Sequence, residues 1–185
     1  LGGKTAGTVT VTNAVAITGD HDQLTAALVT AGSLVEVSDA TVTINDADGT
    51  SITATELSAI GAKTTGTVTV TNAIAISGSP AEVTAALVTA GSLVDVTDAT
   101  VTITGNPTIT ELNNIAAKTT GVVTATLAAD SLSNLGDLTT AGTDAITITV
   151  NDADAAGVTA ANLSTLGGKT AGTVTVTNAV AITGS

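Results

Sequence analysis

Apolar and polar residues alternate strictly in several short stretches of the chain. In Thr8–Thr12, two valines share one face and three threonines share the other, which predicts a β-strand with one buried face. The pair Asn13–Ala14 interrupts the alternation, and asparagine suits such a corner because its side chain bonds to nearby backbone. The alternation resumes at Val15–Ile17. Similar corners recur at Asp39–Ala40, Asn72–Ala73, Asp98–Ala99 and Asn178–Ala179.

Between the extended stretches, apolar residues recur at the spacing of a short helix. Ser79, Pro80 and Glu82 form the signature of a capping box, in which side chains satisfy two free N–H groups of the first turn. Further helix starts of this kind are predicted at Asp20, Thr53 and Thr108. A glycine at the far end predicts that each helix stops in the left-handed conformation after about ten residues. The glycines concerned are Gly32, Gly66, Gly91, Gly121, Gly142 and Gly172.

One stretch of the sequence returns along the chain. Residues 1–19 read LGGKTAGTVTVTNAVAITG, residues 166–184 repeat them letter for letter, and residues 60–78 are a lightly edited copy. Residues 1–44 also align without a gap to residues 60–103. These copies predict a single tandem-repeat array over residues 1–185. Its units are approximately 1–59, 60–114, 115–165 and the partial unit 166–185. Because the chain begins and ends in mid-repeat, we expect it to be a piece of a longer array.

Each unit divides into two similar halves of about 27 residues, near the size of one coil in a solenoid protein. The predicted fold class is therefore a repeat protein, a β-solenoid or α/β solenoid with a short helix plus parallel strands in each coil. Stacked strands lie about 4.8 Å apart, whereas packed helices need about 8–10 Å. A straight stack with a helix in every coil is therefore excluded. The stack curves, the helices splay, or some of these segments are not helical, and the pattern does not choose among the three.

Composition narrows the kind of core and the kind of partner. The chain of 185 residues has no Phe, Trp, Tyr, Cys or Met, so valine, isoleucine, leucine and alanine must fill the interior. The net charge of −12 argues against nucleic acid and anionic membrane surfaces as partners. No run of apolar residues is long enough for a membrane span. A core of such small side chains favours many residues stacked in register.

The sequence predicts no enzyme. A hydrolase or transferase needs a nucleophile beside a base, or two positioned carboxylates. The single histidine, His21, is interpreted as an exposed residue of a helix start. Gly2–Thr5 resembles the end of a phosphate-binding loop, but the copy at Gly167–Thr170 has no glycine at the required upstream spacing. We therefore predict no catalytic residues and no nucleotide cofactor.

Two acidic turns have the alternating oxygen ligands of a possible calcium site. Oxygen-bearing side chains alternate at Asp46 and Asp48, and again at Asp152 and Asp154, as in calcium loops. A loop of the EF type would also need a glutamate at its twelfth position, which is Leu57 here. The alternatives are a calcium site shared by neighbouring coils or a polar corner whose aspartates cap turns.

Threonines and lysines recur in phase with the repeat. Threonine ranks on flat stacked strands are a signature of ice-binding solenoids, although threonine is also a common strand residue. The ranks concerned are Thr8, Thr10 and Thr12; Thr67, Thr69 and Thr71; and Thr173, Thr175 and Thr177. The lysines Lys4, Lys63, Lys118 and Lys169 all occupy one phase and are predicted to form a column. Glu56 and Glu111 precede two of them by seven residues, which suggests surface salt bridges along that column.

Several runs resemble the tandem repeats of giant secreted cell-surface proteins, especially those of cyanobacteria. The runs are LSAIGAKTTGTVTVTNA, ELNNIAAKTTGVVTAT and TAALVTAGSLVDVTDATVTI. The resemblance covers essentially the whole chain and implies an extracellular setting and a role as stalk, adhesin, matrix or fibre. It brings no catalytic residues.

Three hypotheses of function follow. The first is a structural protein of an extracellular or cell-surface filament, in which coils stack end to end, because residues 1–19 and 166–184 match and no capping repeat protects either end. Its partners are other copies and neighbouring repeats of the same protein. The second is an adhesin stalk stiffened by calcium at the acidic turns. The third is an ice-binding protein.

Overall fold

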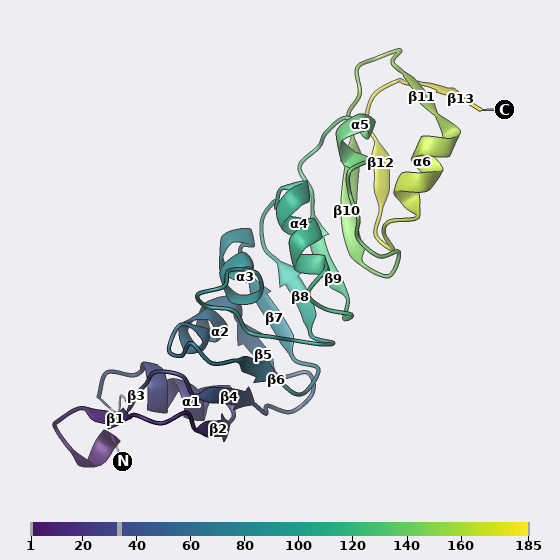
Figure 1. Ribbon diagram of the computed structural model, residues 1–185. Helices are drawn as coiled ribbons and strands as arrows, with labels where there is room; N and C mark the ends of the chain where they lie inside the picture. The colour runs from purple at the N-terminus through teal and green to yellow at the C-terminus, as the bar shows by residue number, and fades with distance from the viewer. Residues whose placement is uncertain (1, 33–34, 185) are drawn as a thin grey trace.

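The computed structural model describes residues 2–32 and 35–184. The molecule is elongated, with the two ends of the chain at opposite ends of the long axis (Figure 1). Short strands alternate with short helices along it. The strands are β1 (Val9–Val11), β2 (Ala16–Gly19), β3 (Val35–Val37), β4 (Thr41–Ile44), β5 (Ser51–Thr53), β6 (Val68–Val70), β7 (Ala75–Gly78), β8 (Thr100–Ile103), β9 (Val123–Thr126), β10 (Ala145–Val150), β11 (Gly157–Thr159), β12 (Val174–Val176) and β13 (Ala181–Thr183). The α-helices are α1 (His21–Leu24), α2 (Ala54–Gly61), α3 (Pro80–Leu87), α4 (Ile109–Ala116), α5 (Leu132–Leu135) and α6 (Ala160–Gly167). A 3₁₀ turn, η1 (Gly2–Lys4), precedes β1, and a π-helical turn, η2 (Thr25–Val29), continues α1.

In the described residues all strand pairs are parallel, and they form four sheets. The largest sheet has six strands in the order β12-β10-β9-β8-β7-β5. A three-stranded sheet has the order β2-β4-β6, and two-stranded sheets join β1 to β3 and β11 to β13. In Figure 1, helices α2, α3 and α4 lie in a row along one side of the six-stranded sheet. Parallel neighbours require a crossover connection, and each helix lies in one of these connections.

The predicted helix starts are confirmed. Asp20, Thr53, Ser79 and Thr108 are N-cap residues, and each takes part in a complete capping box. At Ser79, for example, the side chain accepts a hydrogen bond from the Glu82 N–H, while the Glu82 carboxylate accepts one from the Ser79 N–H at 2.7 Å. These bonds satisfy donors that would otherwise be free in the first helical turn.

The predicted helix ends are wrong. Helices α2, α4 and α6 end at Gly61, Ala116 and Gly167, about one turn before the glycines that were expected to stop them. Among the glycines of the described residues, only Gly49 and Gly105 have a positive φ. The glycines that follow these helices therefore have another role, which the contacts between neighbouring strands explain below.

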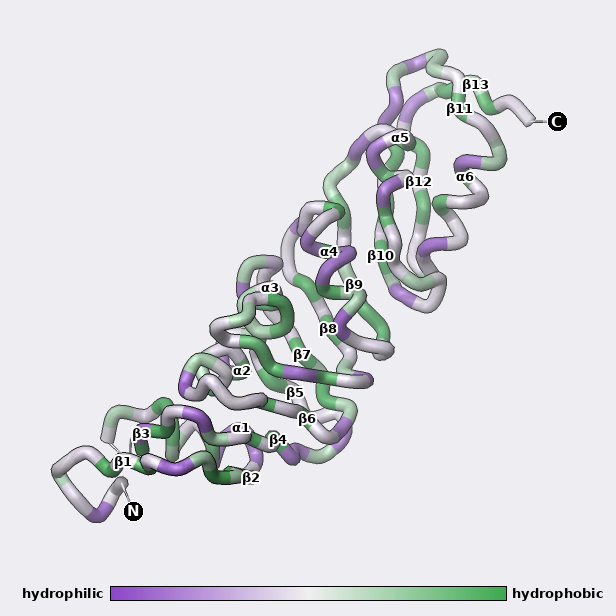
Figure 2. The backbone as a smooth tube through the Cα atoms, viewed as in Figure 1, coloured by the Kyte–Doolittle hydropathy of each residue, from purple (hydrophilic) through white to green (hydrophobic). Residues whose placement is uncertain are grey.

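The core is purely aliphatic. Apolar residues concentrate along the strands and on one face of the helices, as Figure 2 shows. Leucines and isoleucines of the helices pack against valines and isoleucines of the strands, for example Leu57 against the sheet that contains Ile76. The largest fully buried side chains are Leu24, Leu28, Ile44, Ile52, Leu57, Ile60, Ile74, Ile76, Leu87, Leu112, Ile115 and Leu135. The predicted apolar residues of the helices thus do form the interior.

The predicted fold class is wrong. The chain is an α/β fold in which helices mix with parallel sheets of two, two, three and six strands, not a β-solenoid or α/β solenoid built from a regular coil. Paired residues lie from 21 positions apart, at Thr124 and Ala145, to 26 positions apart, at Val9 and Val35. The α-helices have four residues in α1 and α5 and eight in the others. The sequence repeat therefore does not produce one recurring structural unit of about 27 residues.

The different spacings of strands and helices are the physical reason for this difference. Neighbouring strands need about 4.8 Å and neighbouring helices about 8–10 Å, so connections with helices of equal length cannot follow every strand in a straight stack. Here the connections differ in length, and the sheets are interrupted. Within residues 2–32 and 35–184, β3 pairs with β1 only, and β6 meets the next segment through a single bridge between Thr69 and Asp95.

Candidate assembly surfaces

The two ends of the molecule are sheet edges. At the N-terminal end, β1 and β2 each have a strand neighbour on one side only. At the C-terminal end, β12 and β13 are edge strands in the same way. The three residues of β13 are all exposed, and Ile182 in its centre is 60% exposed. An edge strand carries unpaired backbone N–H and C=O groups that can add another strand.

The segments between these ends are of two kinds. We call KT segments the stretches that start with a Lys–Thr pair, and DA segments the stretches that contain an Asp–Ala corner. The KT segments are residues 4–19, 63–78, 118–126 and 169–184, and the DA segments are residues 35–53, 94–104 and 140–159. They alternate along the chain, so three contacts run from a DA segment to the KT segment that follows it.

The threonine of the Lys–Thr pair fastens each of these contacts. The Thr64 hydroxyl donates to the Ala40 carbonyl at 2.6 Å, and the Thr119 hydroxyl donates to the Ala99 carbonyl at 2.6 Å. The hydroxyl of Thr170 is buried and lies 2.8 Å from the Ile146 carbonyl oxygen. Each threonine oxygen also accepts the N–H of the glycine two residues later.

That glycine is needed because two backbones approach closely. A Cβ atom on Gly66 would lie 2.3 Å from the Ala40 carbonyl oxygen. The same atom would lie 2.3 Å from the Ala99 carbonyl oxygen at Gly121 and 2.3 Å from the Ile146 carbonyl oxygen at Gly172. Glycine thus serves here to allow close approach, as it does wherever backbone meets backbone, and not to end a helix.

The acidic turns of two DA segments also stabilise these contacts, because their aspartates accept N–H groups of the following KT segment. The Asp48 carboxylate accepts the Ala73 N–H at 3.0 Å, and the Asp154 carboxylate accepts the Ala179 N–H at 3.1 Å. The asparagine before each of these alanines donates its side-chain amide to the turn. Asn72 donates to the Asp46 carbonyl at 2.5 Å, and Asn178 donates to the Asp152 carbonyl at 2.6 Å.

The first aspartate of each acidic turn caps a helix. The Asp46 carboxylate accepts the backbone N–H of His21 at 2.8 Å, and the Asp152 carboxylate accepts that of Leu132 at 2.8 Å. A carboxylate at a helix N-terminus is favourable because the first N–H groups are free and positive. The four aspartates that suggested calcium are thus all hydrogen-bonded within the protein. In the part of the chain that the structure describes, no group of three or more histidine, aspartate or glutamate side chains is arranged to hold a metal ion.

His21 is more enclosed than the sequence suggested. Its side chain is 16% exposed, and Nδ1 lies 2.7 Å from Asp46 Oδ1. Burial lowers the pKa of the imidazole, but the hydrogen bond and charge of Asp46, with the charges of Asp22 and Glu56, outweigh it and raise the pKa above its ordinary 6.5. Within residues 2–32 and 35–184, no hydroxyl is hydrogen-bonded to the other ring nitrogen, Nε2. The pair therefore serves to hold the acidic turn against α1.

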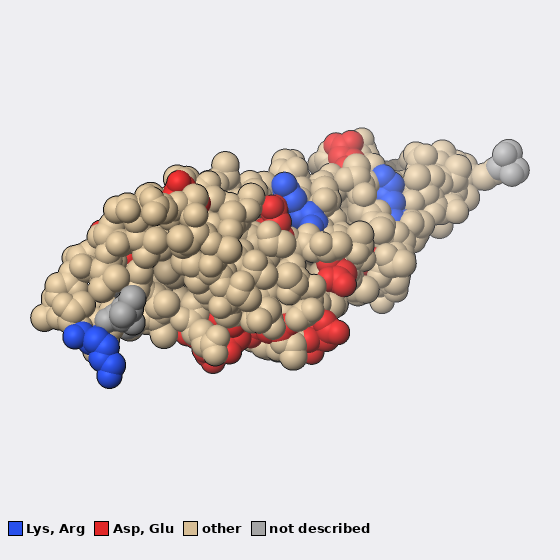
Figure 3. Space-filling view, turned by 60° about the horizontal axis from the view of Figure 1, so that its bottom comes forward, with Lys and Arg blue, Asp and Glu red and all other residues tan. Residues whose placement is uncertain are grey.

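Among the residues that the structure describes, the predicted salt bridges between glutamates and lysines are not present. Glu56 and Glu111 belong to capping boxes, and the hydrogen bonds to Thr53 and Thr108, respectively, lower the pKa of each carboxyl. The Lys169 amine instead donates to the carbonyl of Leu138, just beyond α5. On the face shown in Figure 3, acidic side chains gather along one border and the lysines lie apart from one another.

Threonines form ladders on the uncovered side of the sheets, but not those predicted. Thr10 in the first predicted rank pairs with Glu36 on the neighbouring strand β3, so a charged residue and not a threonine lies beside it. Elsewhere, register places threonine beside threonine across neighbouring strands. The ladders are Thr18–Thr43–Thr69, Thr102–Thr124, Thr126–Thr147, Thr149–Thr175 and Thr159–Thr183. The three ranks predicted from sequence are separated by other strands, because KT and DA segments alternate.

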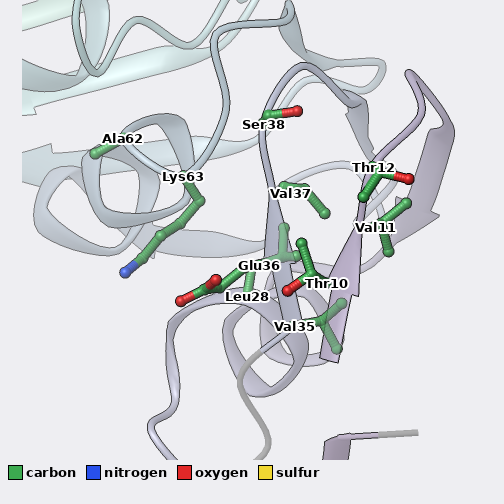
Figure 4. A pocket seen from close by; sticks show the side chains of 10 residues that line it. All are labelled: Thr10, Val11, Thr12, Leu28, Val35, Glu36, Val37, Ser38, Ala62 and Lys63. Atoms are coloured by element: carbon green, nitrogen blue, oxygen red, sulfur yellow. The ribbon is translucent and has the colours of Figure 1, made fainter. Parts of the chain in front are cut away.

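A pocket of about 530 Å³ lies where β3 parts from the strands that follow it. Figure 4 shows Thr10 and Glu36 from the neighbouring strands β1 and β3, with Lys63 from the segment after α2. The other residues that line the pocket include Val11, Leu28 and Val37. The lining includes one carboxylate, that of Glu36, and one amine, that of Lys63. The pocket marks the interruption between sheets.

Comparison with known proteins gives no relative. No protein-family model, no curated protein and no solved structure matches the chain. Among the helices of the described residues, none combines the length and the apolar character needed to cross a bilayer. The resemblance to cell-surface repeats therefore stays a prediction.

Proposed function

We propose that this is a structural protein that joins edge to edge with further copies of its own sequence, as part of an extracellular or cell-surface filament. The joining surfaces are the edge formed by β1 and β2 and the edge formed by β12 and β13. The further copy belongs either to another chain or to a longer chain. Localisation outside the cell rests on the resemblance of the repeats to those of secreted cell-surface proteins.

The observation that carries this proposal is the pair of open, parallel sheet edges at opposite ends of an elongated molecule (Figure 1). The edges are different surfaces, so joining them is a heterologous contact that does not close on itself and builds a filament. Added strands gain backbone hydrogen bonds and cover apolar residues, of which Ile182 is the most exposed large one in the described residues.

Sedimentation velocity over a range of protein concentrations, with electron microscopy of any filaments, tests the proposal. We expect association that grows with concentration. The substitution Ile182→Lys places a charge on the C-terminal edge and should weaken association at least tenfold, since edge lysines oppose strand addition. The matched control is Val122→Lys, because Val122 is the other exposed large apolar residue of the described part of the chain, at 40%, and precedes β9 in the middle of the molecule.

Two outcomes would contradict the proposal. One is a monomer at every concentration, both for this chain and for a chain extended by further repeat sequence. The other is an equal effect of the two lysine substitutions, which would assign association to general apolar contact and not to the edge.

A second candidate function, ice binding, is supported by the threonine ladders. Thr18, Thr43 and Thr69 lie side by side on three neighbouring parallel strands. Strands of a sheet are about 4.8 Å apart, so their hydroxyls form a regular row. Thermal hysteresis of the purified protein measures this activity directly. A Thr43→Lys variant should abolish any hysteresis, and no hysteresis in the unmodified protein would remove the candidate.

A further inference from the structure

The imidazole ring of His21 lies between two carboxylates. Its Nδ1 atom is 2.7 Å from Asp46 Oδ1, and its Nε2 atom is 3.5 Å from Asp22 Oδ1. A protonated imidazole has an N–H group at each nitrogen, so it donates to both carboxylates at once. A neutral imidazole has one N–H group and leaves one of the two carboxylates without a donor. The contact therefore depends on the protonation state of the ring.

The two carboxylates differ in burial. The side chain of Asp46 is 5% exposed, whereas that of Asp22 is 90% exposed. Water hydrates an exposed carboxylate, but a buried one depends on donors from the protein. The neutral ring therefore keeps its hydrogen on Nδ1, toward Asp46, and the lone pair of Nε2 then faces Asp22. Deprotonation of His21 thus removes a positive charge beside a buried carboxylate and retains one hydrogen bond to it.

Asp46 belongs to the first acidic turn, which holds the next KT segment. Its carboxylate accepts the backbone N–H of His21, and its carbonyl accepts the side-chain amide of Asn72 at 2.5 Å. In the same turn, the Asp48 carboxylate accepts the Ala73 N–H at 3.0 Å. A change at the ring of His21 therefore acts on a turn that is bonded directly to the KT segment.

The second acidic turn has the same hydrogen bonds without the histidine. Leu132 occupies the place of His21, and its backbone N–H donates to the Asp152 carboxylate at 2.8 Å. Asn178 donates its side-chain amide to the Asp152 carbonyl, and the Ala179 N–H donates to the second aspartate of the turn. The molecule thus contains a matched contact in which a leucine replaces the titratable ring.

In the described part of the chain, the charged groups that act on the His21 ring are carboxylates. Burial lowers the pKa of the imidazole, but Asp46 of the turn, Asp22 of α1 and Glu56 of α2 outweigh it and raise that pKa above 6.5. The side of the ring that faces Asp22 stays open where another helix precedes, since Ala81 has the position of Asp22 in α3 and is exposed beside α2. The protonated ring is therefore the form that this environment favours.

We infer that His21 is a pH-dependent link between α1 and the first acidic turn, and that through this turn it sets the strength of the contact with residues 72–73. Deprotonation of His21 weakens the contact of Ala73 and leaves the equivalent contact of Ala179 unchanged. Because the pKa of the folded ring is raised, the stabilisation is complete below about 6.5 and is lost as the pH rises through the folded value. The inference goes beyond the proposed assembly and does not depend on it, because every group involved belongs to one chain.

Hydrogen exchange at Ala73 and Ala179 in the unmodified protein tests the inference. The rates are measured at about pH 5.5 and about pH 8.5 and compared with those of unstructured amides, which removes the intrinsic pH dependence. We expect the protection of Ala73, relative to that of Ala179, to fall about threefold or more as the pH rises. A fall of the same size at both amides, or no fall at either, would overturn the inference.

The ring itself gives a second readout in the unmodified protein. The nitrogen chemical shifts of His21, followed by NMR over the same pH range, report the pKa of the ring and the position of the hydrogen in its neutral form. We expect a pKa above 6.5 and the hydrogen on Nδ1. A pKa at or below 6.5, or a neutral ring with its hydrogen on Nε2, would contradict the inference.

Two substitutions complete the test. His21→Leu copies the residue of the second turn and should abolish the pH dependence at Ala73, and a dependence that persists would assign the effect to other groups. Asp22→Asn is the matched control, because Asp22 is exposed and the contact of His21 with Asp46 remains. It should shift the pH dependence at Ala73 to lower pH without abolishing it. Complete loss of the dependence in Asp22→Asn would show that the buried carboxylate is not the partner that matters.

Discussion

Residues 2–19 and 167–184 have the same sequence and different surroundings. Thr5 is exposed, and its hydroxyl oxygen accepts one hydrogen bond, from Gly7. Thr170 is buried, and its oxygen accepts N–H groups from Ile146 at 2.8 Å and from Gly172 at 2.7 Å. The difference is the presence of a DA segment beside the second copy. The threonine and the glycine of a KT segment therefore act in a contact with a DA segment. The KT segment supplies only one side of that contact.

The comparison allows paired substitutions, in which one copy serves as the control for the other. The same change is made at the C-terminal copy, where the contact exists, and at the N-terminal copy, where it does not. A structural role within the segment alone would give equal effects.

The largest difference is expected for glycine. Gly172→Ala places a Cβ 2.3 Å from the Ile146 carbonyl oxygen, so the backbones must separate, at a cost of about 3 kcal/mol. Gly7→Ala meets only the Thr5 hydroxyl oxygen, at 3.6 Å, and should change stability by less than about 0.5 kcal/mol. Urea denaturation of both variants measures the two free energies of unfolding. Equal losses would show that close approach is not the reason for this glycine.

The threonine comes next. Thr170→Val leaves the buried Ile146 N–H without an acceptor and should destabilise the protein by about 2 kcal/mol. Thr5→Val removes a hydroxyl at the surface, and the effect should be close to zero. Hydrogen exchange at Ile146 locates the change in the first variant. Slow exchange at this amide in Thr170→Val would contradict the expectation.

A smaller difference is expected for asparagine. Asn178→Ala removes amide hydrogen bonds to the carbonyls of Asn151 and Asp152 and should cost about 1 kcal/mol, because these bonds are exposed. Asn13→Ala should have no measurable effect, because the Asn13 side chain is exposed. Urea denaturation of both variants measures the difference, and equal losses would contradict the expectation.

A pH effect should distinguish the N-terminal region from the C-terminal one. His21 stands where the other region has Leu132, and the folded pKa of His21 is raised. Its contribution to stability is therefore complete below about 6.5 and is lost as the pH rises through the folded value. We expect the melting temperature to fall by about 2 °C between about pH 5.5 and about pH 8.5. A His21→Gln variant should lose this dependence, and an unchanged slope in that variant would assign the effect to other groups.

The smallest expected effect is that of metal removal. In both regions the aspartates of the acidic turns already accept N–H groups of the protein, so a chelator such as EDTA should leave the melting temperature unchanged. A drop on chelation would restore the calcium-stiffened stalk, since a ligand that binds only the folded state must stabilise it.

The parts of this fold that could be predicted are local. A capping box such as that of Thr53 and Glu56 depends on residues three positions apart, and it forms as expected. The alternation in Thr8–Thr12 predicted a strand, and Val9–Val11 is one. Such patterns can be predicted because the interacting groups, or the alternating side chains, are close together in the sequence.

The parts that could not be predicted depend on residues about 25 positions away. Gly66 and Gly121 look like helix ends in the sequence, and only the position of the preceding carbonyl shows that they allow close approach. The regular solenoid failed for a related reason, since periodicity in the sequence does not reveal where the spacing of helices interrupts a sheet. The hydrogen bond between His21 and Asp46 could not be predicted either, because the two residues are 25 positions apart and no local pattern links them. A possible signal was the shared position of Asp46 and Asp152 in the two acidic turns.

The side-by-side order of the strands along the molecule has a mechanical consequence. A force that stretches the protein end to end pulls along the ladder hydrogen bonds, so they open one row after another instead of sharing the load. Each opened row frees a connection of about 25 residues, which can extend by about 80 Å, against the roughly 4.8 Å that the row occupied. Under tension such a molecule would lengthen in successive steps and re-form when released, and so would act as an extensible tether.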